Sequence, residues 1–439
     1  MFEKASAVVL FLLSLVAAPA AATQDADPFA SQPRLERDVL VRAVLERNPN
    51  LQAAREAWRA AAARPAQARA LEDPTVSYGV APLSIASSDV DFGQEIEVSQ
   101  MLPYPGKRRA RGAAAEAEAD TAREQYHAAR LELTTAASVL FDDYYRVHRA
   151  QEINVEHRLL LEELREIATV RYSAGLAPQQ EPLQAEVEAA ELMHRDVELR
   201  AERMVVTARL NALLHRRPDA ELPPPPDTLP ELPPLGVSGD LEEAALAARP
   251  EIAARAAEIR AREAELEMAR LERKPDFGVM GSYNSMWLDR EHRWMLGASV
   301  SLPVRKERRE AARIEAEARL AQARSELTGM EDEIRSQVRE AVARITEALH
   351  LLELYESRLL PASRDQIRAG RAGYVASQTG FLNVLEAERT LRRVELGHQE
   401  ALAALYQRRA ELERAIGRFP AGVIAEHGAE EGAEEGESR

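Results

Sequence analysis

The chain contains two copies of one pattern, set about 200 residues apart. Four landmarks of the first half return in the second half at a nearly constant offset. They lie at 45–51 and 246–252, 73–76 and 274–277, 100–103 and 300–303, and 210–214 and 412–416. Solenoid repeats are only about 20–50 residues long. Each copy is therefore expected to be a complete structural unit, so the fold must use one unit twice.

The composition excludes several classes of protein. The chain is 30% charged but only 5% aromatic, with 20 Gly in 439 residues, and this usage is typical of long helices. A net charge of −16, with no basic cluster interleaved with aromatic residues, argues against nucleic-acid binding. The absence of cysteine excludes disulfides, Cys-ligated metals and the lipid-anchored cysteine of a lipoprotein.

Residues 1–22 have the layout of a secretory signal peptide. Lys4 precedes an apolar run at 7–18, and small residues at 20–22 offer a cleavage site. The run is too short to span a bilayer, and no later stretch approaches the roughly 18 apolar residues that a membrane helix needs. We therefore expect a mature chain that begins near Thr23 outside the cytoplasm. An uncleaved anchor is the alternative.

Two segments, 75–102 and 276–303, show the period-two alternation of β-strands around a polar interval, which predicts a β-hairpin in each copy. Strands of about ten residues are expected, the length of a tilted transmembrane strand. Tyr283, Trp287 and Trp294 lie near the loop, where an aromatic membrane girdle would lie. The alternative is a soluble hairpin, but an isolated hairpin is marginal in water. Since four strands cannot close a barrel, subunits would have to pool their strands.

Each hairpin leads through a proline, Pro103 or Pro303, into a long helical pattern. Helices are expected over about 107–173 and 307–371. Such rods would be about 100 Å long and would need a coiled-coil environment.

Apolar residues at 3–4 spacing supply that environment. In the second copy they are Leu327, Ile334, Val338, Ala341, Ile345, Ala348, Leu352, Tyr355 and Leu359, then Val384, Ala387, Leu391, Val394, His398, Ala401, Leu405, Leu412 and Ala415. The returning helix of the first copy carries two adjacent stripes, one from Leu183 through Val187 and Val197 to Met204, the other from Ala185 through Leu192 and Leu199 to Leu213. Two stripes indicate a helix with neighbours on both sides, as in the wall of a cylinder.

These patterns divide the chain into domains. A helix over 38–71, with a weak point at Asn48-Pro49, is expected to open the first repeat. The predicted segments are the signal peptide at 1–22, a lead-in at 23–37, repeat 1 at 38–215, a Pro-rich connector at 216–240, repeat 2 at 241–418 and an acidic disordered tail at 419–439.

The sequence offers no motif for catalysis. It has no Gly-rich phosphate loop, no nucleophile elbow and no His-Glu-x-x-His. The nine histidines lack ligand spacing, and His194 and His398, which fall in the apolar stripes, are expected to be packed core residues. We therefore expect no enzyme, no cofactor and no metal site.

The turns that end the long helices stand out from this background. The first tip is expected at about 172–182 and the second at about 373–383. Tyr172 corresponds to Tyr374, and Gly175 corresponds to Ser377, at an offset of 202. With the order of elements repeated twice, and with the 100–108 strand exit, the chain resembles the TolC-type outer-membrane efflux family over about 38–418.

The resemblance implies a mainly α fold with a transmembrane β-barrel. Three chains would form a twelve-stranded barrel continued by a twelve-helix coiled-coil α-barrel in the periplasm. The tips would meet a periplasmic adaptor and an inner-membrane pump. The residues expected to contact the adaptor are Gly175, Leu176, Ala177, Ser377 and Gln378.

The family also implies a periplasmic gate. Acidic residues after the second tip ring its constriction, and the matching positions here are Asn383 and Glu386, so one acid is replaced by a neutral amide. Glu181 would bond to Tyr374 as a latch on the closed state. Ser377 stands where Gly is usual, which puts the geometry of that turn in question. The plainer interpretation of Glu386 is a first-turn carboxylate favoured by the helix dipole.

The expected function is a passive exit duct of a tripartite efflux system in a Gram-negative outer membrane. The strand exit at 102–107 favours a resistance-nodulation-division pump with heavy-metal cations as cargo, while drug efflux and type I protein secretion remain open. Hypotheses of another class are a soluble periplasmic coiled-coil adaptor or scaffold and a metal-binding periplasmic protein.

Overall fold

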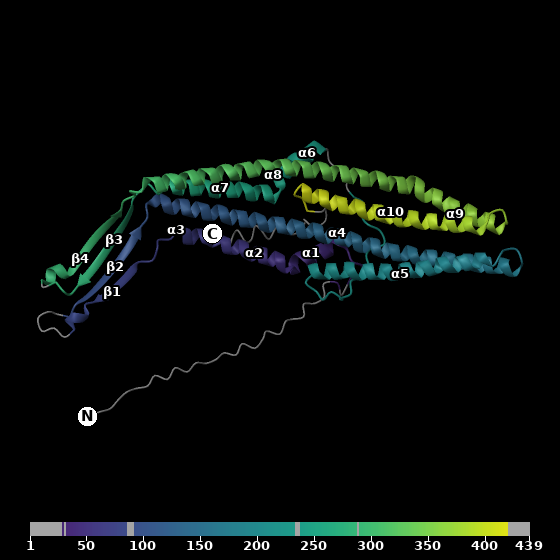
Figure 1. The fold of residues 1–439 in the computed structure, drawn as a ribbon, viewed down its shortest axis with the longest axis horizontal. Helices are drawn as coiled ribbons and strands as arrows, with labels where there is room; N and C mark the ends of the chain where they lie inside the picture. The colour runs from purple at the N-terminus through teal and green to yellow at the C-terminus, as the bar shows by residue number, and fades with distance from the viewer. Residues whose placement is uncertain (1–28, 30–31, 86–91, 233–237, 288, 420–439) are drawn as a thin grey trace, which may run out of the picture.

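The computed structural model is an elongated molecule with a β-sheet at one end and long helices running away from it (Figure 1). The structure describes residues 29, 32–85, 92–232, 238–287 and 289–419. The expected signal peptide and nearly all of the expected tail lie outside these residues. The expectation of a mainly helical chain with a small antiparallel sheet is confirmed.

Four antiparallel strands form the sheet in the order in which they occur along the chain. They are β1 (Thr75–Val80), β2 (Gln94–Leu102), β3 (Asp276–Asn284) and β4 (Trp294–Ser301). The β2–β3 ladder joins the two halves of the chain, from Glu95 opposite Asn284 to Leu102 opposite Phe277. The strands have six, nine, nine and eight residues, so the expected length of about ten is too long. Pro82 and Pro303 lie just beyond β1 and β4 and cannot donate to a ladder.

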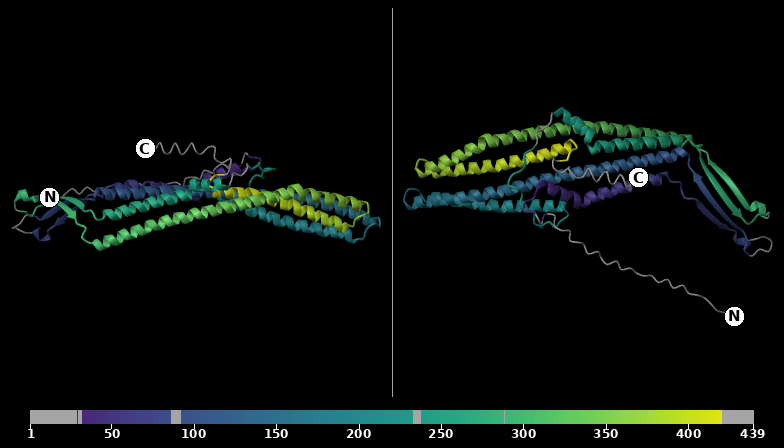
Figure 2. Two further views of the ribbon diagram at one scale, coloured as in Figure 1. Left: turned by 90° about the horizontal axis from the view of Figure 1, so that it is seen from above. Right: turned by 180° about the vertical axis from the view of Figure 1, so that it is seen from behind.

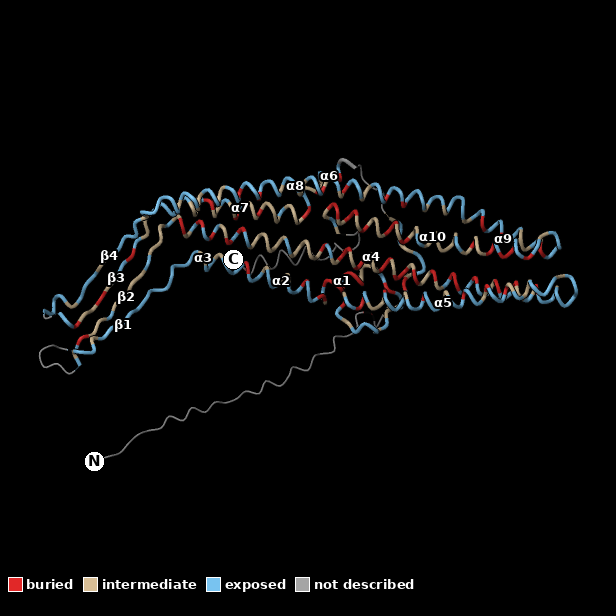
Figure 3. The backbone as a smooth tube through the Cα atoms, in the orientation of Figure 1, coloured by how far each residue is buried: buried red, intermediate tan, exposed pale blue. Residues whose placement is uncertain are grey.

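One face of the sheet is apolar and uncovered. Residues directly opposite in the register share a face, so Tyr78 lies beside Ile96, which in turn lies beside Tyr283. Leu296 is 96% exposed and Trp294 is 74% exposed. The other exposed apolar residues of this face are Val76, Val80, Val98, Phe277, Val279 and Val300. Figure 3 shows the same exposure along β1 and β4.

Long helices make up the rest of the chain. The longest, α4, has 69 residues and a length of about 100 Å. The others are α1 (Arg37–Arg47), α2 (Pro49–Ala62), α3 (Arg64–Arg69), α4 (Pro105–Ser173), α5 (Gln180–Leu213), α6 (Ser238–Ala248), α7 (Pro250–Leu271), α8 (Lys306–Leu354), α9 (Leu360–Val375) and α10 (Phe381–Ala415). Among the residues that the structure covers, no helix is both long enough and apolar enough to cross a bilayer.

The helices lie side by side in one curved layer, as the views in Figures 1 and 2 show. Near the sheet, α4 packs against α2 and α3 on one side and against α7, which packs against α8, on the other. Near the tips, α4 packs against α5 on one side and against α10, which packs against α9, on the other. Because α4 runs through both levels, it connects the two halves of the chain along its whole length.

Three separate apolar clusters hold this layer together. One joins α1, α4 and α5, a second joins the tips of α4, α5, α9 and α10, and a third joins α6, α8 and α10. Of the two stripes on α5, the one with Ala185, Leu192 and Leu199 is buried. The other is left exposed by the described residues: Leu183 and Met204 are 52% and 71% exposed.

The first helical segment is broken more often than expected. The sequence predicted one helix over 38–71 with a weak point, whereas the structure has α1, α2 and α3. At the first break, Asn48 accepts hydrogen bonds on its side-chain oxygen from the N–H groups of Asn50 and Leu51, which caps α2 ahead of Pro49. The second break, at Ala63, precedes Pro65 near the start of α3.

The second long helix is also interrupted, so the expectation of one rod over 307–371 is wrong. A π-helical turn, Tyr355–Leu359, separates α8 from α9, and Leu360 donates its N–H to the carbonyl of Tyr355. Pro361 follows directly. Proline lacks an N–H and its ring would clash with the carbonyl four residues earlier, so an extra residue in the turn relieves that clash. The expectation overlooked this proline.

The π turn packs against Gly397 on α10, which leads to a first prediction. A Cβ at Gly397 would lie 2.9 Å from Cζ of Tyr355, closer than real contacts allow. We expect Gly397→Ala to lower the free energy of unfolding by about 1–3 kcal/mol. Thermal and urea unfolding followed by circular dichroism measures the change.

Gly329 on α8 provides the matched control, because a Cβ there meets nothing within 4 Å. Gly329→Ala should gain up to about 1 kcal/mol through helix propensity alone. Adding Tyr355→Leu to Gly397→Ala should restore most of the loss. Equal stabilisation by both alanine substitutions would show that the π turn exerts no such constraint.

Candidate functional site

The two helical tips have the same backbone geometry. Gly175 has a φ of 70° and Ser377 has a φ of 59°, so both adopt the left-handed conformation that ends a helix. Leu176 donates its N–H to the carbonyl of Arg171, and Gln378 donates to that of Gly373, over 2.8 and 2.7 Å. Serine at the second tip therefore does not change the turn, although a side chain makes this conformation cost about 1–2 kcal/mol.

Arg171 holds the second tip against the first. Its guanidinium donates to the carbonyl of Tyr374 over 3.0 Å and to the hydroxyl of Ser377 over 3.0 Å. It also lies over the ring of Tyr374, 4.6 Å from the centroid. Ser377, which has the strained backbone, is thus held by Arg171 from the other half of the chain. Sequence reasoning did not identify Arg171, because its partners lie about 200 residues away.

Tyr374 and Glu181, which the resemblance paired, lie together. The hydroxyl of Tyr374 donates a 2.5 Å hydrogen bond to the carboxylate of Glu181 on α5. The ring is 2% exposed and packs against Phe381 with centroids 5.5 Å apart. Burial, followed by the hydrogen bond to Glu181, raises the pKa of Tyr374 well above its usual value. The hydroxyl therefore stays protonated and keeps donating.

Asn383 and Glu386 do not join this contact. The two residues lie one turn apart on α10, on a face that is exposed in the single chain. The neighbouring residues Val384, Leu385 and Ala387 are buried. Among the described residues Glu386 has no ion-pair partner within 4 Å. The expected contact residues of the tips are also open: Gly175, Leu176, Ser377 and Gln378 are exposed, and Ala177 is half-buried.

A buried ionic cluster lies further along the helices toward the sheet, and sequence reasoning missed it. The Nδ1 atom of His157 on α4 lies 2.9 Å from Glu388, and its Nε2 atom lies 2.9 Å from Glu395, both on α10. His157 is 3% exposed and Glu388 is fully buried. Because both ring nitrogens face carboxylates, both must carry protons, and the imidazole is a cation.

The same region contains a second set of ion pairs between the halves. Glu188 on α5 is 1% exposed and accepts hydrogen bonds from Arg389 and Arg392 on α10. Burial raises its pKa, but the two hydrogen-bonded arginines outweigh burial and lower it. Arg392 also lies 3.7 Å from Glu388, which links this set to His157. These buried charges make α10 a shared partner of α4 and α5.

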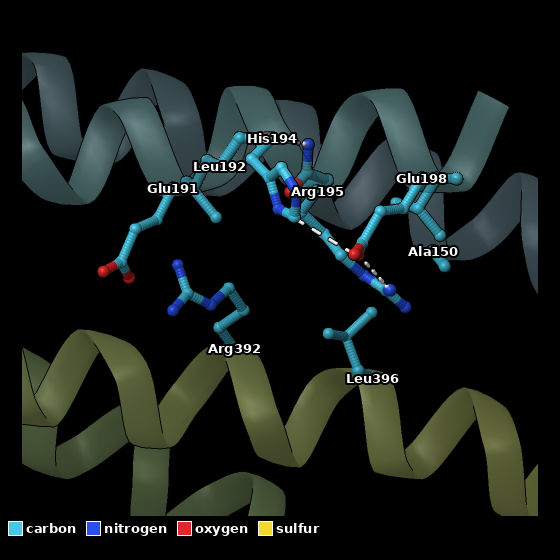
Figure 4. Close-up of a pocket in the computed structure, with 10 residues that line it drawn as sticks. Ala150, Glu191, Leu192, His194, Arg195, Glu198, Arg392 and Leu396 are labelled. Atoms are coloured by element: carbon cyan, nitrogen blue, oxygen red, sulfur yellow. Dashed lines mark hydrogen bonds and ion pairs between the residues drawn. The ribbon is translucent and has the colours of Figure 1, made fainter. Parts of the chain in front are cut away.

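A pocket of about 380 Å³ opens beside this cluster between α5 and α10 (Figure 4). Arg392 rises toward it from α10, and Arg195 and His194 line it from α5, each paired with Glu198. The side chain of His194 is 78% exposed, so within the single chain it does not pack in a helical seam. It belongs to the exposed stripe of α5, and its packing in a seam stays a prediction. His398, by contrast, is largely covered, with 16% of its side chain exposed.

The aromatic residues expected in a membrane girdle gather at the loop end of the sheet. Tyr283 and Trp294 are directly opposite in the register, with ring centroids 5.1 Å apart. Trp287 follows β3 and is 47% exposed, 6.1 Å from the ring of His292. Within the described part of the chain, no group of three or more His, Asp or Glu side chains is placed to hold a metal ion.

The His157 cluster predicts a pH-dependent stability. Burial lowers the pKa of His157, but the hydrogen bonds and charges of Glu388 and Glu395 outweigh burial and raise the pKa from 6.5 to about 9. The native pKa lies above the usual one, so this stabilisation is complete below pH 6.5 and is lost as the pH rises through 9. The free energy of unfolding should fall by about 3 kcal/mol across that window.

Urea unfolding at pH 6, 7.5 and 9 measures this effect, with His157→Gln as the test variant. The difference in stability between wild type and variant should shrink as the pH rises, which isolates His157 from other titrating groups such as Asp142, whose pKa burial raises to about 7. His398→Gln is the control and should keep the wild-type slope. A constant difference between wild type and His157→Gln would mean that His157 is neutral in the folded chain.

Comparisons with known proteins agree with this architecture. Residues 241–418 match the family described as Outer membrane efflux protein. No curated protein sequence matches the chain. The outer-membrane channel OprN is similar in structure, with a TM-score of 0.72 and 21% identity over 89% of this chain and 95% of that one.

Two further solved structures share the fold. The outer membrane protein VceC from Vibrio cholerae has a TM-score of 0.72 and 20% identity over 87% of this chain and 96% of its own. CusC, studied for transmembrane channel formation, has a TM-score of 0.75 and 17% identity over 87% and 92%. The resemblance is thus confirmed: the second half of this chain matches the family described as Outer membrane efflux protein, and the chain as a whole has the fold of these solved structures.

Proposed function

We propose that three copies of the chain form a passive exit duct in the outer membrane of a Gram-negative cell. The duct takes cargo from an inner-membrane pump and a periplasmic adaptor and has no catalysis of its own. The two repeats supply its wall, the sheets form its membrane barrel, and the tips form its periplasmic gate.

The exposed apolar face of the sheet carries this proposal. A surface with Leu296 at 96% and Trp294 at 74% exposure is unstable in water and suited to lipid. The outer edges of β1 and β4 also have unpaired backbone groups, which lipid cannot satisfy. Pairing β1 of one copy with β4 of the next closes these edges, and three four-stranded sheets supply a twelve-stranded barrel. A soluble adaptor or scaffold would leave this face without a partner.

The exposed apolar stripe of α5, which runs from Leu183 to Met204, supports the same assembly. Leu183, Val187 and Met204 are exposed at coiled-coil spacing along α5, although this helix contacts both α4 and α10. The opposite border of the layer is formed by α8 and α9, which also present apolar residues, including Leu354 at 42% and Val375 at 65% exposure. Joining α5 of one copy to this border of the next closes the layer into a cylinder.

The tips are the proposed gate. The Tyr374–Glu181 hydrogen bond and the contacts of Arg171 tie the two hairpins of one chain together, and this tie favours the closed state. The exposed side chains of Asn383 and Glu386 would then face the axis, where three carboxylates attract cations and repel one another. Gly175, Leu176, Ala177, Ser377 and Gln378 form the surface offered to the adaptor.

For the cargo we propose a heavy-metal cation or a drug delivered by a resistance-nodulation-division pump. The carboxylate at Glu386 favours a cationic cargo, and the strand exit at 102–107 resembles that of the heavy-metal branch. A type I protein secretion duct is the alternative for the same assembly.

The latch gives a prediction for Tyr374→Phe, which removes only the hydroxyl. A hydrogen bond to a charged group contributes about 1.5–3 kcal/mol, so the open state should gain population by roughly tenfold or more. Single-channel recordings in planar bilayers should show longer and larger openings. Tyr172→Phe is the matched control, since Tyr172 occupies the same position of the first tip and is 44% exposed. Conductance equal to wild type in Tyr374→Phe would exclude the latch.

The cation ring gives a prediction with two opposite changes. Glu386→Gln should raise the concentration of divalent cation needed for half-maximal block by at least tenfold, since it removes three carboxylates, each of which attracts a cation with roughly 1 kcal/mol per unit charge in water. Asn383→Asp should lower that concentration. Block measured from the tip side of a planar bilayer tests both. If neither variant shifts the blocking concentration, the residues do not line the constriction.

A further inference from the structure

A group of cationic side chains lies where the sheet meets the helices. We call it the junction belt and define it as Arg108, Arg109, Arg111, Arg305, Lys306 and Arg308. It occurs in both halves at the same place: α4 begins three residues after the end of β2, and α8 begins five residues after the end of β4. Residues 105–111 contain four cations and no acid in a chain of net charge −16, so the belt does not follow from the bulk composition.

Contacts within the described part of the chain neutralise little of the belt's charge: Arg108 donates to the carbonyl of Arg69, and Arg111 interacts with Asp276, which already pairs with Lys107. Arg109, Arg111, Arg305, Lys306 and Arg308 are exposed, and none of them forms an ion pair with the described residues. Lys107, by contrast, is buried and pairs with Asp276 over 2.8 Å, so it serves the fold and is left out of the belt.

Helix stability does not explain the belt either. Cations in the first turns of a helix oppose the helix dipole, which favours acidic residues there. The first turn of α4 has no acidic residue, and in α8 the one acid of the first turn, Glu307, lies between the cations Lys306 and Arg308. An arrangement that is unfavourable for the helices indicates a negative partner outside the chain.

The position of the belt identifies that partner. The belt follows directly after the exposed apolar face of the sheet, and the apolar residues between them, Leu302 at 69% and Val304 at 76%, are exposed as well. Arg111, the belt residue deepest in α4, lies six residues into the helix, about 9 Å from its start. Apolar surface followed by cations is the order in which a protein meets acyl chains and then anionic headgroups.

We propose that the junction belt binds the anionic phospholipid headgroups of the leaflet on the helix side of the membrane. This inference rests on the proposed outer-membrane function, since it requires the sheet to lie in a bilayer. In the trimer each copy contributes two cationic runs, so the belt would encircle the duct at the base of the barrel. It would fix the depth of the sheet in the membrane and select phosphatidylglycerol-type lipids over zwitterionic ones.

The test measures which lipid stays with the full-length protein. The purified assembly is equilibrated in mixed micelles of equal phosphatidylglycerol and phosphatidylcholine, repurified, and its bound lipids are quantified by mass spectrometry. At 0.1 M salt we expect at least threefold enrichment of phosphatidylglycerol. The enrichment should fall toward onefold at 1 M salt, where the Debye length is about 3 Å. The salt series needs no variant and so does not depend on the folding of one.

Two variants sharpen the test. Replacing Arg305, Lys306 and Arg308 with Gln should halve the enrichment, and replacing all six belt residues with Gln should abolish it. The control replaces Arg158, Arg358 and Arg393 with Gln; these are exposed cations of α4, the π turn and α10, remote from the sheet. Equal retention of the two lipids by wild type, or undiminished enrichment in the six-residue variant, would overturn the inference.

Planar-bilayer recordings of the wild type separate this outcome from failure of the proposed function. If the wild type conducts but retains both lipids equally, the belt proposal fails and the duct stands. If the wild type neither inserts nor conducts, the duct proposal fails and the belt proposal fails with it.

Discussion

The architecture depends on one constraint: the sheet leaves an apolar face and two hydrogen-bonding edges open. The β2–β3 ladder satisfies the inner edges by joining the two halves of the chain, but no described residue pairs with the outer side of β1 or β4. Lipid can cover the face but cannot satisfy the edges, because it offers no hydrogen-bonding groups. The proposed duct meets both needs: a bilayer covers the apolar face, and further copies of the same chain pair with the open edges.

The opposite end of the molecule is held by different interactions. At the tips the halves meet through the Tyr374–Glu181 hydrogen bond and the contacts of Arg171, and further toward the sheet they meet through the buried pairs of His157. Such contacts are individually weaker than a continuous backbone ladder and depend on protonation and on salt. The β end is thus suited to remain closed, and the helical tips are suited to open. A duct with a permanent membrane barrel and a movable gate requires this division.

Much of the fold follows from local pattern, whereas the side-chain contacts at the tips do not. Strand alternation and proline exits predicted the hairpins and the starts of the long helices because these signals lie within a few residues. Pro361 also marks the π turn in the sequence itself, because a proline inside a helical pattern predicts an interruption there. The partners of Arg171 and His157 lie some 200 residues away, and no periodicity indicates them. Tyr374 and Glu181 were paired only through the family resemblance. The exposure of His194 in the single chain was not predictable, because a stripe on α5 does not reveal whether its partner is in the same chain.

The central claim, that this chain is a third of a closed tube, can be tested most directly by its stoichiometry. Native mass spectrometry of the assembly extracted from outer membranes in mild detergent counts the chains without relying on any variant. The account predicts three copies and no detectable free monomer, since a monomer would expose the sheet edges and the α5 stripe together. A stable, detergent-soluble monomer, or an assembly whose copy number is not three, would contradict it.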